Sequence, residues 1–252
     1  MAVLAMSLCS CSILSGISWN SDGLASAAGK AITAASISDD MVAQLCQQSV
    51  AQLDAQATID HGEYSKRLAK VMEGFTDIDG LPVNMKVYIT NDINAFASGD
   101  GSIRVYSGLM DVMDDDELTA IIGHEIGHVR NQDTKNSIKA AYLASAARDV
   151  VASAGNYGAI AAYLLGDIGE ALVSAQYSQK CEYKADAHGC DFAISRGCSP
   201  YSMYNALQKL LSLSGSSSNS IIAHMFADHP KTELRAEKMK ARAESYLSKS
   251  SR

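Results

Sequence analysis

The stretch Leu118-Thr-Ala-Ile-Ile-Gly-His124-Glu125-Ile-Gly-His128-Val-Arg130 decides the fold, because it places two histidines four residues apart in an apolar-periodic segment. Residues Asp114 to Asp116 precede it and supply capping oxygens and negative charge, so the pattern predicts a helix that begins there. Four residues turn a helix by about 400°, so His124 and His128 project from one face, roughly 6 Å apart along the axis. This spacing is typical of a pair of zinc ligands.

Glu125 lies one step round the same helix from His124. Its carboxylate can reach a water molecule on the metal without taking a ligand position, which is the placement that a general base requires. A zinc ion lowers the pKa of such a water to about 7, so the three residues predict hydrolysis of a carbonyl compound. Because three residues also match by chance, the prediction depends on a further ligand elsewhere in the chain.

A catalytic zinc keeps one position open, so one more protein ligand is expected. The segment from Ser178 to His188 reads as a helix and offers Glu182 and Asp186, which are four residues apart and share a face, whereas His188 points about 240° away from Glu182. We expect Glu182 to bind the zinc ion and Asp186 to accept a hydrogen bond from the outer nitrogen of His124. The alternative is that Glu182 pairs with a neighbouring lysine on a solvated face.

These motifs occur together with Asp228-His-Pro230 downstream and with Asn94–Ala97 and Ile103–Leu109 upstream. Over roughly residues 38–245 the combination resembles the gluzincin zinc metalloendopeptidases of the HtpX, BepA and LoiP type, and most of all the periplasmic lipoprotein proteases of the LoiP type. The resemblance implies one zinc ion per chain, held by His124, His128 and Glu182. It also implies that Glu125 is the catalytic base, that Asp186 orients a ligand histidine, and that His229 faces the zinc-bound water or the oxyanion.

The composition favours one well-buried domain. The chain has 252 residues, of which 47% are hydrophobic. Its formal net charge of -7 argues against nucleic acid as a partner. No run of eighteen uninterrupted apolar residues occurs, so no membrane-spanning helix is expected. We predict a mostly helical α+β fold, a zincin-like metallopeptidase domain over residues 38–252 with a small β-sheet beside the His-Glu-x-x-His helix.

The first 37 residues differ in composition from the rest. Residues 1–11 are apolar and end in Leu8-Cys-Ser-Cys11, which resembles the end of a bacterial lipoprotein signal, with Cys11 as the lipidated residue. No Lys or Arg precedes this run, so a disordered end is the alternative. Residues 12–37 are rich in Ser, Ala and Gly and form either a tether or a segment lying over the domain.

Further periodic segments predict the remaining elements. Helices are expected at Asp39–Ile59, Tyr64–Phe75 and Lys231–Leu247, and another is expected to begin at Pro200. A strand is expected at Val83–Thr90, and a hairpin is expected to pair Asn94–Ser98 with Ser102–Tyr106. In zinc peptidases an exposed strand above the metal can pair with an extended substrate, and the residues predicted for this role are Asn94, Ala95, Phe96 and Ala97. An ordinary edge strand is the alternative.

The Ala-rich segment Lys135–Gln176 predicts closely packed amphipathic helices that cover the cleft, although a hydrophobic patch for lipid or an unfolded client remains open. Of the six cysteines, four lie beyond Cys11 and allow one or two disulfides.

The function predicted from the sequence is that of a zinc metalloendopeptidase that cleaves unfolded or misassembled envelope proteins in the periplasm, anchored to the outer membrane through a lipid on Cys11. Envelope assembly factors are expected among its partners. The competing prediction is a chaperone or assembly factor whose zinc site is blocked by its own chain and which cleaves little.

Overall fold

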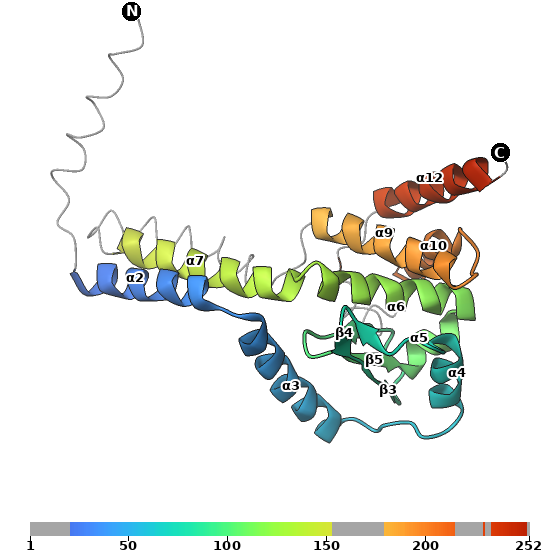
Figure 1. Cartoon of the computed structure of the whole chain (residues 1–252), viewed down its shortest axis with the longest axis horizontal. Coiled ribbons are helices and arrows are strands. Elements are labelled where there is room, and N and C mark those ends of the chain that lie inside the picture. Colours follow the sequence, from blue (N-terminus) through green and yellow to red (C-terminus); the bar gives the residue numbers. More distant parts are fainter. Residues whose placement is uncertain (1–20, 153–178, 215–228, 230–232, 251–252) are drawn as a thin grey trace, which may run out of the picture. The chain divides into compact units, whose positions relative to one another are not determined.

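The computed structural model of the chain describes residues 21–152, 179–214, 229 and 233–250 (Figure 1). The chain divides into two compact units. The first comprises Met1–Ile37 with Asn136–Ala175, and the second comprises Ser38–Lys135 with Gln176–Arg252. The second unit holds the sheet and the helix with the His-Glu-x-x-His motif, in the mostly helical α+β arrangement predicted from the sequence.

A three-stranded sheet forms one layer of the second unit. Its strands are β3 (Asn84–Tyr88), β4 (Ala95–Ala97) and β5 (Ser102–Tyr106), in the order β3-β5-β4. Strand β5 pairs antiparallel with β4 and parallel with β3. The predicted strand and hairpin are thereby confirmed, and the turn between β4 and β5 includes Gly101, whose φ of +84° favours glycine.

A second, two-stranded hairpin was not predicted. It joins β1 (Asp77–Ile78) to β2 (Leu81–Pro82) through Asp79 and Gly80, which both have positive φ, at 53° and 89°. This is the backbone of a tight hairpin turn that Asp-Gly favours. The signal was present in the sequence as Asp-Gly between Ile78 and Leu81, but the strands are too short to show an alternating pattern.

Helix α6 (Asp115–Arg130) carries the motif and runs through the core. Asp114 caps it, and a capping box is completed by Glu117, so its start agrees with the prediction. From Glu117 to His128 every residue is buried. Figure 1 shows α6 between the sheet on one side and helices α9 (Gln179–Ser195) and α10 (Ser202–Ser214) on the other.

Among the remaining helices of the second unit, the one at Ser107–Val112 was not predicted from the sequence. Helix α12 (Glu233–Ser250) packs against α9 and α10. Helix α5 (Ser107–Val112) follows β5 directly. Helix α4 (Glu63–Val71) ends four residues before the predicted boundary at Phe75, because the chain turns at Gly74, where φ is +76°.

Helix α3 (Asp39–Gln56) is fixed to the rest of the second unit near both ends. Near its C-terminus, Asp54 accepts hydrogen bonds from Arg104 of β5 and from Lys86 and Tyr88 of β3. Arg104 points away from the core, because its neighbours along β5 point into it. At the N-terminus of α3, Asp39 lies 2.6 Å from the ammonium group of Lys135.

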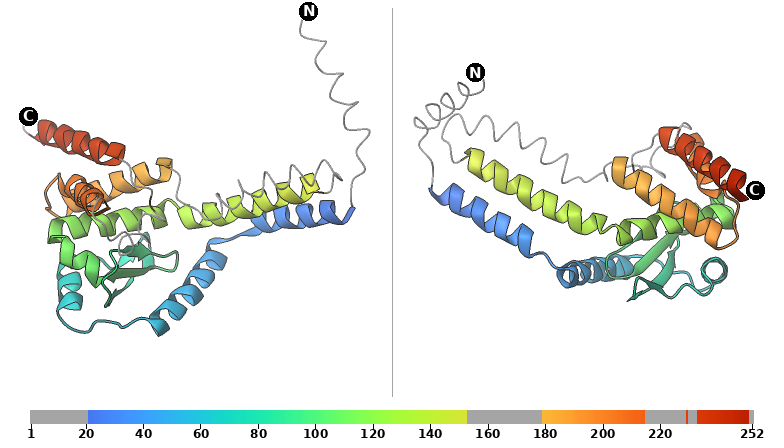
Figure 2. Two further views of the ribbon diagram at one scale, coloured as in Figure 1. Left: turned by 180° about the vertical axis from the view of Figure 1, so that it is seen from behind. Right: turned by 45° about the horizontal axis from the view of Figure 1, so that its top comes forward.

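In the first unit, helix α2 (Ser21–Ser36) lies beside α7 (Asp133–Ala152), as Figures 1 and 2 both show. Asp149 of α7 accepts a hydrogen bond from Ser26 at 2.6 Å and pairs with Lys30 at 2.8 Å. The Ser, Ala and Gly-rich segment predicted as a tether or overlying segment is therefore helical from Ser21 onward.

Some predictions fall outside the described residues, namely those on Cys11, on residues 153–178, and on Asp228 and Pro230. None of the described helices combines the length and the apolarity needed to cross a bilayer. Among the described cysteines no disulfide forms.

Candidate metal centre

Helix α6 brings His124 and His128 together, as their spacing requires. Their Nε2 atoms are 3.0 Å apart, and the two rings are nearly perpendicular, at 82°. Both side chains are buried. The two nitrogens therefore point at one common place inside the protein.

Helix α9 contributes two carboxylates to the same place. Glu182 Oε1 lies 3.3 Å from His128 Nε2, and Asp186 Oδ1 lies 2.9 Å from His124 Nδ1. Glu182 thus faces the inner nitrogen of one histidine, while Asp186 faces the outer nitrogen of the other. Residue His188, two positions further along α9, lies outside this cluster, with its Nδ1 2.7 Å from the carbonyl oxygen of Gly123.

The two helices reach this proximity through glycines. A Cβ atom on Gly189 of α9 would lie 2.5 Å from the carbonyl oxygen of Ala120, and one on Gly127 of α6 would lie 3.1 Å from the Cα of Ala185. Neither position has room for a larger residue. The backbones therefore approach closely enough for the short side chain of Asp186 to reach His124.

His229 also enters the cluster, through both of its ring nitrogens. Its Nδ1 lies 3.3 Å from His124 Nε2 and 3.1 Å from Glu182 Oε1, while its Nε2 lies 3.6 Å from Glu125 Oε1. The position of Nδ1 makes His229 a further possible ligand. The sequence did not reveal this, because spacing along the chain says nothing about a residue brought in from a distant segment.

The four side chains fit a zinc ion. One donor atom from each of them lies within 4.8 Å of the others. In a tetrahedral site with Zn–N distances near 2.0–2.1 Å, neighbouring donors are about 3.3 Å apart, which matches the separations of 3.0–3.3 Å between the donors described above. The donors are imidazole nitrogens and a carboxylate oxygen, a combination that suits zinc.

The charge balance points in the same direction. Four buried carboxylates surround the histidines, whereas Arg235 is the one buried guanidinium beside them among the described residues; the acids are Glu125, Asp133, Glu182 and Asp186. Burial by itself lowers the pKa of His128, but its hydrogen bonds with Asp133 and Glu182 raise that pKa to about 9. The cluster therefore attracts positive charge, from protons or from a divalent cation.

Two residues that the sequence analysis missed hold the cluster in place. Asp133 Oδ2 lies 2.8 Å from His128 Nδ1. Arg235 reaches both acids of α9, with Nη1 2.7 Å from Glu182 Oε2 and Nη2 2.7 Å from Asp186 Oδ1. These contacts depend on how the chain packs. In the sequence, the only indication was that Asp133 lies close to His128 and Arg235 lies close to His229.

The sheet presents an open edge at β4. The opposite edge, at β3, is partly covered, because the amide of Ile89 donates to Thr58 and that of Asp60 donates to Val87. Within the described part of the chain, no strand pairs with the outer side of β4. Asn94 precedes the strand and is buried, with its side chain bonded to the amide of Ala95, so the strand itself comprises Ala95–Ala97.

Comparison with known proteins agrees with this geometry. The model of peptidase family M48 matches residues 62–243. The chain is 41% identical to the metalloprotease LoiP of Escherichia coli (strain K12) over 88% of each chain, and 38% identical to the metalloprotease YcaL of the same strain over 84% of each. A protease HtpX homolog of Streptococcus equi subsp. zooepidemicus is 29% identical over 62% of this chain and 66% of its own. The family model covers most of the chain, and two histidines of α6 meet two carboxylates of α9 in the structure. The chain therefore belongs to peptidase family M48.

Proposed function

We propose that this protein is a zinc-dependent endopeptidase that cleaves unfolded or misassembled envelope proteins. One observation carries the proposal. Donor atoms of His124, His128 and Glu182 converge inside the protein, and the buried carboxylate of Glu125 stands on the same helix beside them. Three protein ligands and a neighbouring base are the elements that metal-assisted hydrolysis requires.

Each residue of the cluster has a separate role in the proposed hydrolysis. His124, His128 and Glu182 would hold the zinc ion, which when bound polarises the scissile carbonyl and acidifies the attacking water. Glu125 accepts a proton from that water and passes it to the leaving amine. His229, whose Nε2 lies 3.6 Å from Glu125 Oε1, would donate a hydrogen bond to the developing oxyanion.

Other contacts keep the ligands in orientation. Asp186 and Asp133 each bind the Nδ1 atom of one histidine, so both imidazoles offer Nε2 to the metal. Arg235 occupies the remaining oxygen of Glu182, which leaves Oε1 facing the histidines. The contacts with Asp186 and Asp133 favour the tautomer with a proton on Nδ1 and fix the ring orientation of His124 and His128.

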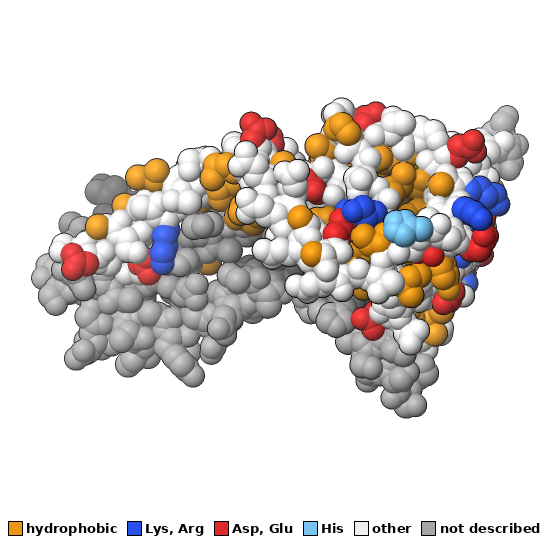
Figure 3. Space-filling model, turned by 90° about the horizontal axis from the view of Figure 1, so that it is seen from below, with side chains coloured by type: hydrophobic (Ala, Val, Ile, Leu, Met, Phe, Trp, Pro, Cys, Tyr) orange, Lys and Arg blue, Asp and Glu red, His pale blue; other side chains and the backbone are white. Residues whose placement is uncertain are grey.

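The open edge of β4 supports the choice of unfolded chains as substrates. An extended peptide can add to such an edge through main-chain hydrogen bonds, which do not depend on side-chain identity. An unfolded chain readily presents the extended backbone that such pairing requires. On the face in Figure 3, acidic and basic side chains of the described residues are interspersed, which supports a protein rather than a nucleic-acid partner.

The cellular location is proposed from the sequence. Leu8-Cys-Ser-Cys11 and the resemblance to periplasmic lipoproteases support export and a lipid anchor on Cys11 at the outer membrane. Metabolic labelling with a fatty acid tests this. An unlabelled protein, or equal labelling of Cys11→Ser, would exclude the anchor.

The test of the peptidase proposal compares the wild-type protein with Glu125→Gln. Both proteins should contain about one zinc ion per chain, because Glu125 is not among the ligands. Casein degradation should fall by about 10²–10⁴-fold in the variant, the usual contribution of a general base. Equal degradation by both proteins would mean that a contaminating protease is responsible.

The position of His229 favours a second candidate, a chaperone or assembly factor whose own chain closes the zinc site. With His229 Nδ1 as fourth ligand the coordination would resemble that of a structural zinc. The variant His229→Ala separates the two functions. The peptidase proposal predicts retained zinc and slower cleavage, since an oxyanion donor is lost. A closed site predicts faster cleavage, or no cleavage by either protein while aggregation of a client is still suppressed.

A further inference from the structure

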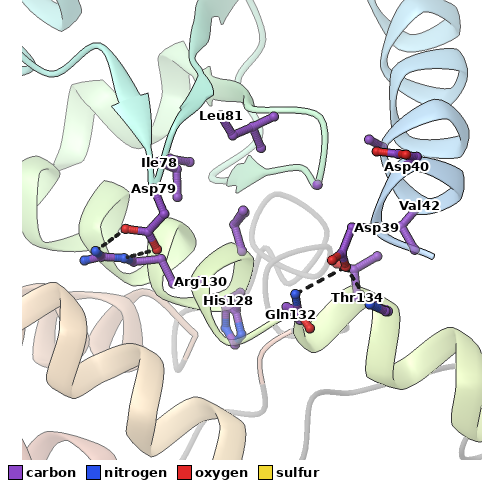
Figure 4. A pocket seen from close by; sticks show the side chains of 14 residues that line it. Asp39, Asp40, Val42, Ile78, Asp79, Leu81, His128, Arg130, Gln132 and Thr134 are labelled. Atoms are coloured by element: carbon purple, nitrogen blue, oxygen red, sulfur yellow. Dashed lines mark hydrogen bonds and ion pairs between the residues drawn. The ribbon is translucent and has the colours of Figure 1, made fainter. Parts of the chain in front are cut away.

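A pocket of about 320 Å³ lies next to the metal-binding cluster. Figure 4 shows the hairpin β1–β2 on one side of it and α3 on the other, with the end of α6 between them. All of the residues that line it belong to the second unit. We propose that this pocket binds an apolar side chain of the substrate close to the scissile bond, an inference that rests on the proposed peptidase function.

The position of the pocket connects it to both parts of the site. His128, a proposed zinc ligand, forms part of its wall. Gly99 forms another part, and it lies two residues beyond Ala97, where β4 ends. The pocket thus borders both the metal-binding cluster and the end of the strand that is proposed to pair with the substrate.

One part of the wall is apolar and fits an apolar group. Val42 of α3 and Ile78 of the hairpin are buried and contribute hydrocarbon, and Leu81 and Val129 extend the same surface. An apolar side chain that enters such a pocket gains the free energy of leaving water.

The charges among the lining residues are largely neutralised. Asp79 accepts hydrogen bonds from Arg130, with the Nε atom at 2.9 Å, and Asp39 pairs with Lys135. Asp40 adds a carboxylate to the lining, and no ion pair of it is found within the described ranges. The lining therefore carries an excess of negative charge, which disfavours an acidic side chain.

The pocket is built from fixed elements. The contact between Asp79 and Arg130 ties the hairpin to α6, while Asp39 and Asp54 tie the two ends of α3. A Cβ atom on Gly99 would lie 3.2 Å from Val42, so this wall is already packed closely against α3. Little ordering is then required when a side chain binds, which favours selectivity.

A reciprocal pair of variants tests the pocket. Ala43→Leu reduces its volume from the α3 side, and Leu81→Ala enlarges it from the hairpin side. Leu53→Ala is the matched control, because Leu53 lies on α3, is exposed and does not line the pocket. Each protein digests the same mixture of unfolded peptides, and the cleavage sites are mapped by mass spectrometry.

The wild-type protein should prefer Leu, Ile, Met or Phe over Asp and Glu at one position near the cleaved bond. Ala43→Leu should lower kcat/KM for large residues at that position by about tenfold, and Leu81→Ala should shift the preference towards larger residues. The control should match the wild type. A preference that is absent, or that survives both pocket variants unchanged, overturns the pocket assignment; a wild-type protein that cleaves no peptide instead overturns the proposed function.

Discussion

Arg235 is the residue that joins the two acidic side chains of α9. Its guanidinium group is buried and contacts Glu182 and Asp186 at 2.7 Å each. If it is replaced by Met, two buried carboxylates lose their shared cation. We expect the free energy of unfolding to fall by about 3–5 kcal/mol and the zinc affinity to fall as well. Urea denaturation and competition with a zinc chelator measure the two effects.

The chain offers a matched control for this prediction in Arg242. It lies on the same helix, α12, and pairs with Asp191 at the surface, where both side chains are well exposed. Exposed ion pairs contribute about 0–1 kcal/mol, so Arg242→Met should change little. Equal losses of stability in the two variants would show that α12 tolerates no substitution and that the buried contact has no special role.

At the residue scale, local spacing predicted part of the cluster. A spacing of four residues puts two side chains on one face of a helix, and it occurs twice, in His124 with His128 and in Glu182 with Asp186. The structure brings these two faces together. Local spacing could not predict the contact of Arg235 with Asp186, because the two residues are 49 positions apart along the chain. Nor could it predict which nitrogen of His229 would enter the cluster, because that depends on the packing of a distant segment.

At the scale of elements, the distance between α6 and α9 controls the cluster. Gly189→Ala would place a Cβ atom 2.5 Å from the carbonyl oxygen of Ala120, so the two helices must separate. Such overpacking costs about 1–3 kcal/mol. The carboxylates of α9 would move away from His124 and His128, so zinc affinity should fall together with the thermal midpoint of unfolding.

Gly29→Ala is the control for a glycine in a helix. Gly29 lies in α2, and nothing is within 4 Å of the place where its Cβ would be. Alanine is the better helix former by up to about 1 kcal/mol, so this variant should be as stable as the wild type or more so. If Gly189→Ala behaves in the same way, the close approach of α6 and α9 is not what positions the acids.

The attachment of α3 to the sheet should depend on pH. The hydrogen bond from Arg104 is the main reason that the pKa of Asp54 lies well below its ordinary value of 3.8. A carboxylate with a lowered pKa in the folded state stabilises the protein above its ordinary pKa and loses that contribution as the pH falls below it. We therefore expect α3 to loosen below about pH 4.

Hydrogen exchange of the α3 amides across that range measures the loosening. In Asp54→Asn the amides of α3 should exchange faster at neutral pH, with a weaker dependence on acid. A variant that keeps the full acid dependence would show that another carboxylate causes the effect.

Whole elements were predicted better than their pairing. Helices with clear periodicity, such as α6, α10 and α12, lie where the sequence indicated. The parallel pairing of β3 with β5 was not predicted, because a strand pattern does not name its partner. The hairpin β1–β2, which forms a wall of the pocket, was missed because each strand has only two residues.

At the scale of the whole molecule, one unit contains every part of the proposed active site. The metal-binding cluster, the open edge of β4 and the adjacent pocket all belong to the unit formed by Ser38–Lys135 and Gln176–Arg252. Its two segments are separated in the chain by Asn136–Ala175. The third proposed ligand is thus brought beside the first two by folding, since α6 and α9 lie on different segments.

The most direct test of this account is anomalous diffraction at the zinc absorption edge from crystals of the full chain. The account predicts one peak per chain, about 2.0–2.2 Å from His124 Nε2, His128 Nε2 and an oxygen of Glu182. The same peak should vanish in crystals of His124→Ala. A peak at any other group of side chains, or none in zinc-saturated crystals, would contradict the central claim.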